Sequence, residues 1–290
     1  VTSIGACAFI DCTSLKQVEI PDSVESIGES AFAGCTSLSD ITIPDSVTSI
    51  NLNTFCNCTS LETIILPDSI SGIGNCAFMN CTSLVDITIP NSVTSMGTQA
   101  VYGCTKLKTI LFPNELTAIN SYMCKNCTAL ETVVIPESVT SIGAQAFAEC
   151  TSLMSVYCKP VKVPTLANVN AFQNNAAELK IYVPMSSVTQ YKKDSKWKSL
   201  TSAIDIDPSS MKKSDYYIEY TSTNGAIVMP NGSFDATIVG NFYENGIGKL
   251  YFDAPVISIV DYAFDSYISL ASVTIPDSVT SIGKGAFGNC

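Results

Sequence analysis

The sequence holds an unusual set of residues that could do chemistry: 13 Cys, no His, and 15 basic residues that are all Lys. His is the commonest general base and metal ligand in proteins, and Arg is the usual bidentate clamp for carboxylates and phosphates. Nucleophilic catalysis by Cys or Ser normally uses a His base, and no motif supports the Ser–Lys or N-terminal variants. We therefore expect a protein that is not an enzyme and that carries no metal and no cofactor.

Most of the Cys residues follow a spacing of 23 residues, which predicts a structural ladder of small buried side chains, since free Cys is often buried. The ladder comprises Cys12, Cys35, Cys58, Cys81, Cys104, Cys127 and Cys150, and Cys290 falls in the same column. Cys124 and Cys127 form a C-x-x-C pair, but Cys124 lies in a column of core Phe residues, which favours a core thiol over zinc. A disulfide or a reactive thiol is left open for Cys7, Cys56 and Cys76.

Three other patterns resemble functional motifs, for phosphate binding, glycosylation and glycoside hydrolysis, but each has a better structural explanation. The run Gly246–Lys249 lacks the spacing of a phosphate-binding loop, and a hairpin turn explains it better. Asn57, Asn80 and Asn126 match the glycosylation pattern, but each precedes a ladder Cys and is interpreted as a turn residue. Paired carboxylates for glycoside hydrolysis stay an alternative, although most acids occupy exposed strand or turn positions.

The same period extends to Pro and Leu and predicts a solenoid, because one such unit cannot bury its own apolar face. The repeated Pro residues are Pro21, Pro44, Pro67, Pro90, Pro113 and Pro136. In each unit, or rung, apolar and polar residues alternate before the Pro and indicate a half-buried strand. A second short extended piece follows, then a Gly turn, and then an Ala-Phe segment expected to form one helical or 3₁₀ turn.

One outward-facing column of the predicted strands becomes more apolar along the chain, from Thr42 to Tyr157. An exposed apolar strip often marks a binding surface, whereas ordinary β-branched strand filling would also explain it. The candidate binding surface consists of Ile65, Thr88, Thr109, Leu111, Thr132, Val134, Ser155 and Tyr157.

The unit C-T-S-L-x-x-I-x-I-P-x-S-V-T-S-I-G-x-x-A-F resembles the BspA-like class of leucine-rich repeats of bacterial surface and secreted proteins. The resemblance covers residues 1–157 and about 255–290. It implies an α/β leucine-rich repeat solenoid, dominated by β structure with short helical or 3₁₀ turns in each rung, together with a capping segment and the start of a second array.

Charge and period divide the chain into four predicted segments. Residues 1–157 form the leucine-rich repeat array and carry a net charge of −10 (4 Lys, 14 acids), whereas residues 158–213 carry +5 (9 Lys, 4 acids). Residues 158–204 are predicted to form an irregular last rung and a cap, in which Val188 and Tyr191 share one face of a short helix. Residues 205–254 are predicted to form a linker, within 205–215, and a small β unit with a turn at Pro230-Asn231-Gly232. Residues 255–290 begin a second array.

A net charge of −11 argues against a nucleic-acid partner, and no apolar run reaches the roughly 18 residues of a membrane span. The resemblance implies an extracytoplasmic protein, on the cell surface or secreted, with its targeting segment outside this fragment. The predicted function is adhesion or protein–protein interaction with a host or cell-surface partner. The alternatives are a glycan-binding module, with Tyr102, Tyr122 and Tyr157 as an aromatic platform, and a rigid spacer.

Overall fold

A computed structural model describes residues 1–207, 210, 216–231 and 234–290. The contacts between residues divide the chain into two compact units. Unit 1 comprises Val1–Tyr182 and Asp194–Ala203, and unit 2 comprises Val183–Lys193 and Ile204–Cys290. Most of the predicted linker 205–215 and Gly232 of the predicted turn lie outside the described residues, and the four-segment division stays a prediction.

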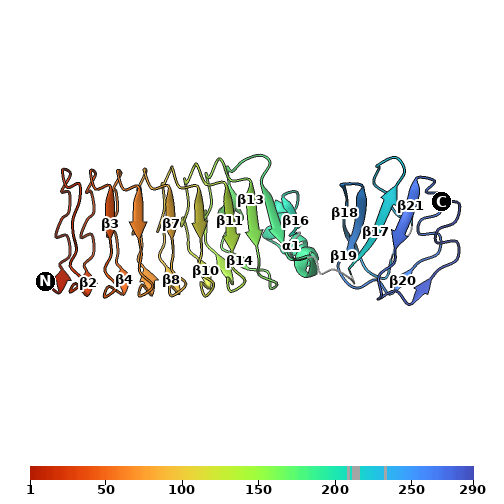
Figure 1. The fold of residues 1–290 in the computed structure, drawn as a ribbon, viewed down its shortest axis with the longest axis horizontal. Helices are drawn as coiled ribbons and strands as arrows, with labels where there is room; N and C mark the ends of the chain where they lie inside the picture. Colours follow the sequence, from red (N-terminus) through yellow and green to blue (C-terminus); the bar gives the residue numbers. More distant parts are fainter. Residues whose placement is uncertain (208–209, 211–215, 232–233) are drawn as a thin grey trace. The chain divides into compact units, whose positions relative to one another are not determined.

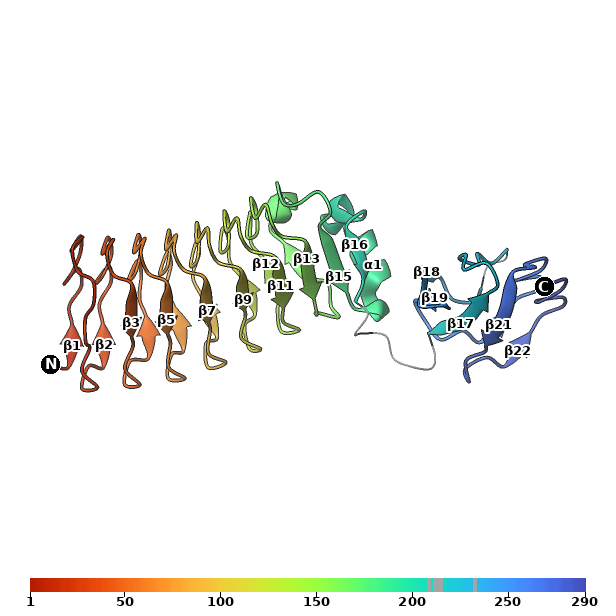
Figure 2. The same cartoon turned by 45° about the horizontal axis from the view of Figure 1, so that its top comes forward.

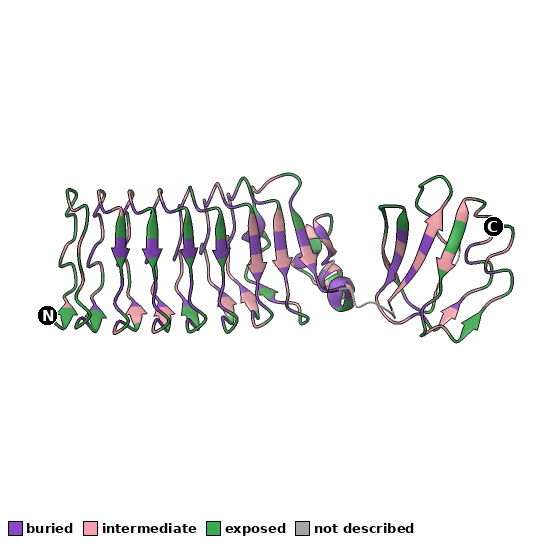
Figure 3. Ribbon diagram, in the orientation of Figure 1, coloured by how far each residue is buried: buried purple, intermediate pink, exposed green. Residues whose placement is uncertain are grey.

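Unit 1 is a stack of rungs, and from Asp40 onward each rung contributes one strand to a column of parallel strands, which is hydrogen-bonded as a β3-β5 pair and a sheet running from β7 to β15 (Figures 1 and 2). The burial pattern of the shorter strands is exposed–buried–exposed, as their alternating sequence predicts. Figure 3 shows this alternation along the array. The strands of this first column are β3 (Asp40–Thr42), β5 (Thr63–Ile65), β7 (Asp86–Thr88), β9 (Thr109–Leu111), β11 (Thr132–Ile135), β13 (Ser155–Cys158) and β15 (Lys180–Val183).

A second column of two-residue strands follows the Pro of each rung and also pairs in parallel. The register joins residues 23 apart, as in Ile50 with Ile73, and widens to 24 at the irregular rung, where Ile142 pairs with Leu166. The strands are β1 (Ser3–Ile4), β2 (Ser26–Ile27), β4 (Ser49–Ile50), β6 (Gly72–Ile73), β8 (Ser95–Met96), β10 (Ala118–Ile119), β12 (Ser141–Ile142) and β14 (Thr165–Leu166).

The Ala-Phe segments of the regular rungs are hydrogen-bonded turns, where a helical or 3₁₀ turn was expected. Alternate N–H groups bond within the turn and to the next rung: Ala33 N–H donates to the Ser30 carbonyl, and Phe32 N–H donates to the Thr54 carbonyl. Left-handed residues, with φ near +54° at Ser30 and +74° at Gly34, flank the turn. This outward exchange of hydrogen bonds prevents a helix from forming and ties each rung to its neighbour.

Stacked Phe rings fill the middle of the solenoid. Phe9, Phe32, Phe55 and Phe78 stack in sequence with centroids 5.1–5.6 Å apart. Val101 and Cys124 interrupt this column, and Phe147 and Phe172 resume it at 5.4 Å. Stacked pairs of this kind add to the large area that each ring buries.

Trp197 packs against the last core ring of unit 1. Its ring centroid lies 6.1 Å from that of Phe172, and its indole N–H donates to the Pro164 carbonyl at 2.7 Å. Lys196 donates to the carbonyls of Leu166 and Ala167. The residues of this region form η1 (Val169–Phe172) and η3 (Trp197–Leu200). Trp197 therefore covers apolar core while Lys196 satisfies carbonyl groups, and both contacts are ones that the predicted cap would need.

Unit 2 contains an antiparallel sheet in the order β18-β19-β17-β21. Its core includes Leu250, Phe252 and Phe264, and Phe264 stacks on Phe287 at 5.1 Å, so the repeat columns are restored here. Within the described ranges, no helix is long and apolar enough to cross a membrane. The elements are η2 (Met185–Ser187), α1 (Val188–Lys193), β16 (Ile204–Ile206), β17 (Tyr217–Ser222), β18 (Ile238–Glu244), β19 (Ile247–Phe252), β20 (Ser258–Ile259), β21 (Leu270–Thr274) and β22 (Ser281–Ile282).

Phe147→Ala tests the central ring column. Phe147 is fully buried, stacks on Phe172 and meets the edge of Phe112 at 6.3 Å. Removal of the ring leaves a cavity and is expected to lower the free energy of unfolding by about 3–5 kcal/mol. Denaturant titration measures the change, followed by the fluorescence of Trp197, which lies in unit 1, and by circular dichroism. A loss below about 1 kcal/mol would contradict the packing described.

Candidate functional site

The outward residues of β3 to β15 form one continuous surface of unit 1, called here the strand face. The parallel register places Leu111 beside Thr88 and Val134, and Tyr157 beside Val134 and Tyr182. Ile65 is paired with Thr42, and β5 lies in contact with β7. One line of side chains therefore crosses the rungs, because inward and outward residues alternate along each strand.

The candidate residues are all outward on this surface but differ in exposure. Ile65 and Leu111 are 68% and 62% exposed, which is high for large apolar side chains in a sheet. Thr88 and Thr109 are also exposed, whereas Thr132, Val134, Ser155 and Tyr157 are half-buried. The apolar character is thus concentrated in two protruding residues and an aromatic end.

The aromatic end is a stacked pair. The rings of Tyr157 and Tyr182 have centroids 4.9 Å apart and planes within 19°, and the Lys159 ammonium lies 5.6 Å from the Tyr157 centroid. Tyr182 falls outside the column predicted from the repeat, because the irregular rung places it 25 residues after Tyr157. The run KIYVP, which keeps the strand-then-Pro pattern, is the signal that could have found it.

The aromatic platform considered for glycan binding is not assembled. Tyr102 and Tyr122 belong to the turn segments, where Tyr102 N–H donates to Gln99 and Tyr122 has a left-handed φ of 59°. Tyr157 belongs to β13 and already has a ring and a cation against it. The three Tyr side chains therefore occupy different parts of their rungs.

Acidic side chains accompany the first rungs of the strand face. Asp86 accepts a hydrogen bond from the Thr109 hydroxyl at 3.3 Å, and Asp40 accepts one from Ser39 at 3.0 Å. Glu19 and Glu62 are exposed beside them. Among the described residues, none of these four carboxylates forms an ion pair. The Ile65 end of the strand face is therefore negative, and the Tyr157 end carries Lys159 and Lys180.

The ladder Cys side chains have a shared geometry. Each S–H donates to the backbone carbonyl of the residue 26 positions earlier, in the central ring column of the preceding rung. The Sγ–O distances are 3.1–3.2 Å for Cys35, Cys58, Cys81, Cys104, Cys127 and Cys150. These six side chains are buried, so the ladder satisfies carbonyl groups that lie in the core.

Cys12 differs from the other ladder residues, because it is exposed. Cys290 is exposed too, although its S–H donates to the Phe264 carbonyl at 2.9 Å. The thirteen Cys are all free; Cys7 is exposed, and Cys56 and Cys76 are half-buried. Cys158 and Cys124 are buried in their Ile and Phe columns.

Burial disfavours the thiolate in the six buried ladder residues. It raises the pKa of Cys58 from its ordinary 9.0 to about 12, with a further contribution from the nearby Cys35 thiol. Burial likewise raises the pKa of Cys150 to about 12 and those of Cys56 and Cys76 above their ordinary value. Since the thiolate is the nucleophile, these groups are poor candidates for reactive thiols.

The other sequence patterns have structural explanations. Asn57, Asn80 and Asn126 all adopt left-handed φ values of 58–62°, which Asn tolerates, so the glycosylation pattern coincides with a required turn residue. Asn245 and Gly246 form the turn between β18 and β19, with φ of 52° and 83°, and Lys249 belongs to the second strand. Within the part of the chain described, no group of three or more His, Cys, Asp or Glu could hold a metal ion.

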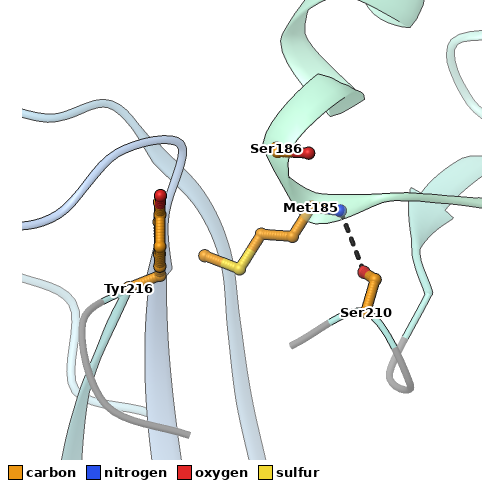
Figure 4. A pocket seen from close by; sticks show the side chains of 4 residues that line it. All are labelled: Met185, Ser186, Ser210 and Tyr216. Atoms are coloured by element: carbon orange, nitrogen blue, oxygen red, sulfur yellow. Dashed lines mark hydrogen bonds between the residues drawn. The ribbon is translucent and has the colours of Figure 1, made fainter. Parts of the chain in front are cut away.

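A pocket of about 170 Å³ in unit 2 is lined by Met185, Ser186, Ser210 and Tyr216 (Figure 4). Its Ser210 hydroxyl accepts the Met185 N–H at 2.9 Å and donates to the Asp207 carbonyl at 2.7 Å. This hydroxyl is therefore engaged with two backbone groups of the chain.

Comparison with known proteins identifies the repeat. A model of BspA-type leucine-rich repeat regions matches residues 1–100, 49–180, 117–231 and 238–290. The chain belongs to the BspA-type leucine-rich repeat family. The predicted fold, a β-dominated leucine-rich repeat solenoid, is thereby confirmed. No curated protein matches the sequence.

Solved leucine-rich repeat proteins resemble this family member to different degrees. One from T. pallidum is 36% identical with a TM-score of 0.51, over 53% of this chain and 72% of its own. One from Bacteroides ovatus ATCC 8483 is 25% identical with a TM-score of 0.44, over 100% of this chain and 68% of its own. A leucine-rich cell surface protein of Faecalibacterium prausnitzii A2-165 is 24% identical with a TM-score of 0.32, over 71% and 80%.

The raised thiol pKa values predict that stability falls at alkaline pH. Folded thiols hold their protons up to a pKa near 12, whereas unfolded thiols release theirs near 9, so the free energy of unfolding falls across this window and is unaffected below it. Urea midpoints between about pH 7.5 and about pH 10.5 measure the slope. The variant Cys81→Ala/Cys104→Ala is expected to show a shallower slope; an identical slope would contradict the thiol origin.

Burial also predicts the order in which thiols react. Cys7, Cys12 and Cys290 are exposed and should react fastest with a chromogenic disulfide reagent, followed by the half-buried Cys56 and Cys76. The remaining thiols should react only when the protein unfolds, because burial keeps them out of contact with solvent. Mass spectrometry of the labelled sites identifies them, and rapid native labelling of Cys81 or Cys104 would refute the buried ladder.

Proposed function

We propose that this protein is a non-catalytic, extracytoplasmic binding protein that uses the strand face for adhesion or for contact with another protein. The observation that carries the proposal is the exposure of Ile65 and Leu111 on a sheet whose other described outward residues are mostly small or polar. Large exposed apolar side chains in a continuous strip are typical of interaction surfaces. An extended, shallow strip suits a macromolecule better than a small substrate, which needs an enclosed pocket.

Family membership supports an extracytoplasmic location, because the BspA-like resemblance implies surface or secreted proteins. Six ladder Cys residues, together with Cys124 and Cys158, are buried and so protected from oxidation, which is compatible with that location. Cys7, Cys12, Cys56, Cys76 and Cys290 lack this protection. The acidic strand face and the net charge of −11 favour a protein partner over a nucleic acid.

The variant Ile65→Asp/Leu111→Asp tests the strand face. The purified protein is screened against panels of matrix and cell-surface proteins and of glycans. Bound proteins should bind the variant at least about tenfold more weakly, because two desolvated apolar anchors become charged. Leu52→Asp is the matched control: Leu52 is 38% exposed, lies in a turn after β4 and should leave binding unchanged.

Three other outcomes would refute the proposal. Selective glycan binding that depends on Tyr157 would favour a carbohydrate module. Protein binding that Ile65→Asp/Leu111→Asp leaves intact would place the interaction elsewhere on the molecule. The absence of any partner in both panels would favour the rigid spacer.

A further inference from the structure

A groove adjoins the acidic end of the strand face. A cavity of about 290 Å³ lies between Gln17–Ile20 of the first rung and β3, Asp40–Thr42, of the second. Gln17–Ile20 occupies the same column as β3, 23 residues earlier, but it does not form a strand. The cavity is called here the first-rung groove. It shares Asp40 and Thr42 with the strand face and is therefore continuous with it.

The first-rung groove lies where backbone pairing is interrupted. Ser39 N–H donates to the Lys16 carbonyl at 3.3 Å, and beyond this bond none joins Gln17–Ile20 to β3 among the described residues. The same two rungs are bonded elsewhere: β1 pairs with β2, and Phe9 N–H donates to the Ala31 carbonyl at 2.7 Å. The opening is therefore local and is already present in the folded protein, as ligand sites usually are.

The floor of the first-rung groove is apolar. Val18, Ile20 and Ile41 are among the residues that line it. Ile41 is buried, whereas Val18 and Ile20 are half-buried, so an apolar group laid along them would lose contact with water, which is favourable. The cavity of about 290 Å³ lies at the lower end of the range for ligand pockets, about 300–1,000 Å³, and suits one long side chain better than a whole small molecule.

The rim of the first-rung groove carries two carboxylates on neighbouring rungs. Glu19 and Asp40 line the cavity and are exposed. Neither forms an ion pair among the described residues, although Lys16 precedes the groove in the sequence. Two carboxylates at one small cavity repel each other, so a cation placed between them stabilises both. An apolar floor with a negative rim is complementary to a long cationic side chain, which buries its stem and keeps its charge near water.

The hydrogen bonding of Asp40 favours Lys over Arg. Its Oδ2 already accepts the Ser39 hydroxyl at 3.0 Å, which leaves fewer acceptor positions for the two parallel donors of a guanidinium. The Lys ammonium is a compact charge with three donors, and it can approach one oxygen of each rim carboxylate.

We propose that the first-rung groove receives a Lys side chain of a partner protein, with its methylene stem on Val18 and Ile41 and its ammonium between the two rim carboxylates. This inference rests on the proposed function, because it names the chemistry of a partner bound to the strand face. Thr42, which lines the groove, pairs with Ile65 on the next rung. One partner can therefore place a Lys in the groove and an apolar residue against the strand face.

The first experiment is a methyl NMR titration of the complete protein, labelled at its Ile and Val methyl groups. The probes are blocked Thr-Ile-X-Ile-Thr peptides in which X is Lys, Arg or norleucine, the last of which keeps the stem without the charge. The Lys peptide should shift the Val18 and Ile41 methyl signals and bind at least about fivefold more tightly than the norleucine peptide. Equal binding of these two peptides, tighter binding of the Arg peptide, or shifts confined to other methyl groups would overturn the inference.

The second experiment removes the rim charges while preserving the size of the side chains. Glu19→Gln/Asp40→Asn should weaken binding of the Lys peptide at least about fivefold and leave the norleucine peptide unaffected. Asp45→Asn/Asp68→Asn is the matched control, because it changes the net charge equally at exposed turn positions outside the groove and should have little effect. Unchanged thermal unfolding confirms that each variant folds. Full binding by the folded groove variant, or an equal loss in the control, would contradict the proposed site.

These results separate the inference from the proposed function. If the Lys peptide does not reach the groove while a protein partner still depends on Ile65 and Leu111, the Lys inference is wrong and the strand face remains the binding surface. If the Lys peptide binds in the groove but no partner depends on Ile65 and Leu111, the Lys site is supported and the proposed use of the strand face is wrong.

Discussion

The constraint on which this structure depends is the register of 23 residues between successive rungs. Each rung leaves backbone groups and an apolar side unsatisfied, and the next rung satisfies both. Ile50 pairs with Ile73 in the second strand column, and Phe32 N–H reaches the Thr54 carbonyl in the turn. A change in register would displace all of these partners together, so the period is preserved even where individual core residues differ.

Side-chain ladders explain a composition that is rich in Ser, Thr and Cys and low in charge. Ser69, Ser92 and Ser138 donate at 2.7 Å to carbonyls of the preceding rung. The Thr that follows each ladder Cys from Cys35 to Cys150 donates to the corresponding Thr carbonyl of the preceding rung at 3.3–3.5 Å. The Cys thiols do the same inside the core. Short hydroxyl and thiol side chains suit this task because they donate one hydrogen bond without filling the space between rungs. The Ser, Thr and Cys columns therefore hold the rungs together, and the outward strand positions remain available for binding a partner.

The strand face becomes aromatic at the rungs where the regular repeat begins to change. Tyr157 occupies the column that holds Thr, Ile, Leu or Val in the rungs from Thr42 to Val134, Tyr182 stacks on it from an irregular rung, and Trp197 packs against Phe172 in the core. The departure from the period of 23 thus creates the only stacked aromatic pair among the described residues of the strand face. Large aromatic side chains serve two purposes in this region: Trp197 packs against the core, and Tyr157 and Tyr182 lie on the strand face where a partner could contact them.

The sequence by itself determined the rungs, their strands, the buried columns and the outward line from Thr42 to Tyr157, because a strict repeat makes every local pattern recur. It also placed Cys124 and Cys158 in core columns. Only the tertiary structure decided that the Ala-Phe segments are turns, since their N–H groups bond across rungs. It alone showed that Cys12 is exposed, that Tyr102 and Tyr122 are apart from Tyr157, and that Tyr182 joins it. These features depend on which side chains the neighbouring rung covers and which hydrogen bonds it exchanges. The sequence pattern within one rung does not contain that information.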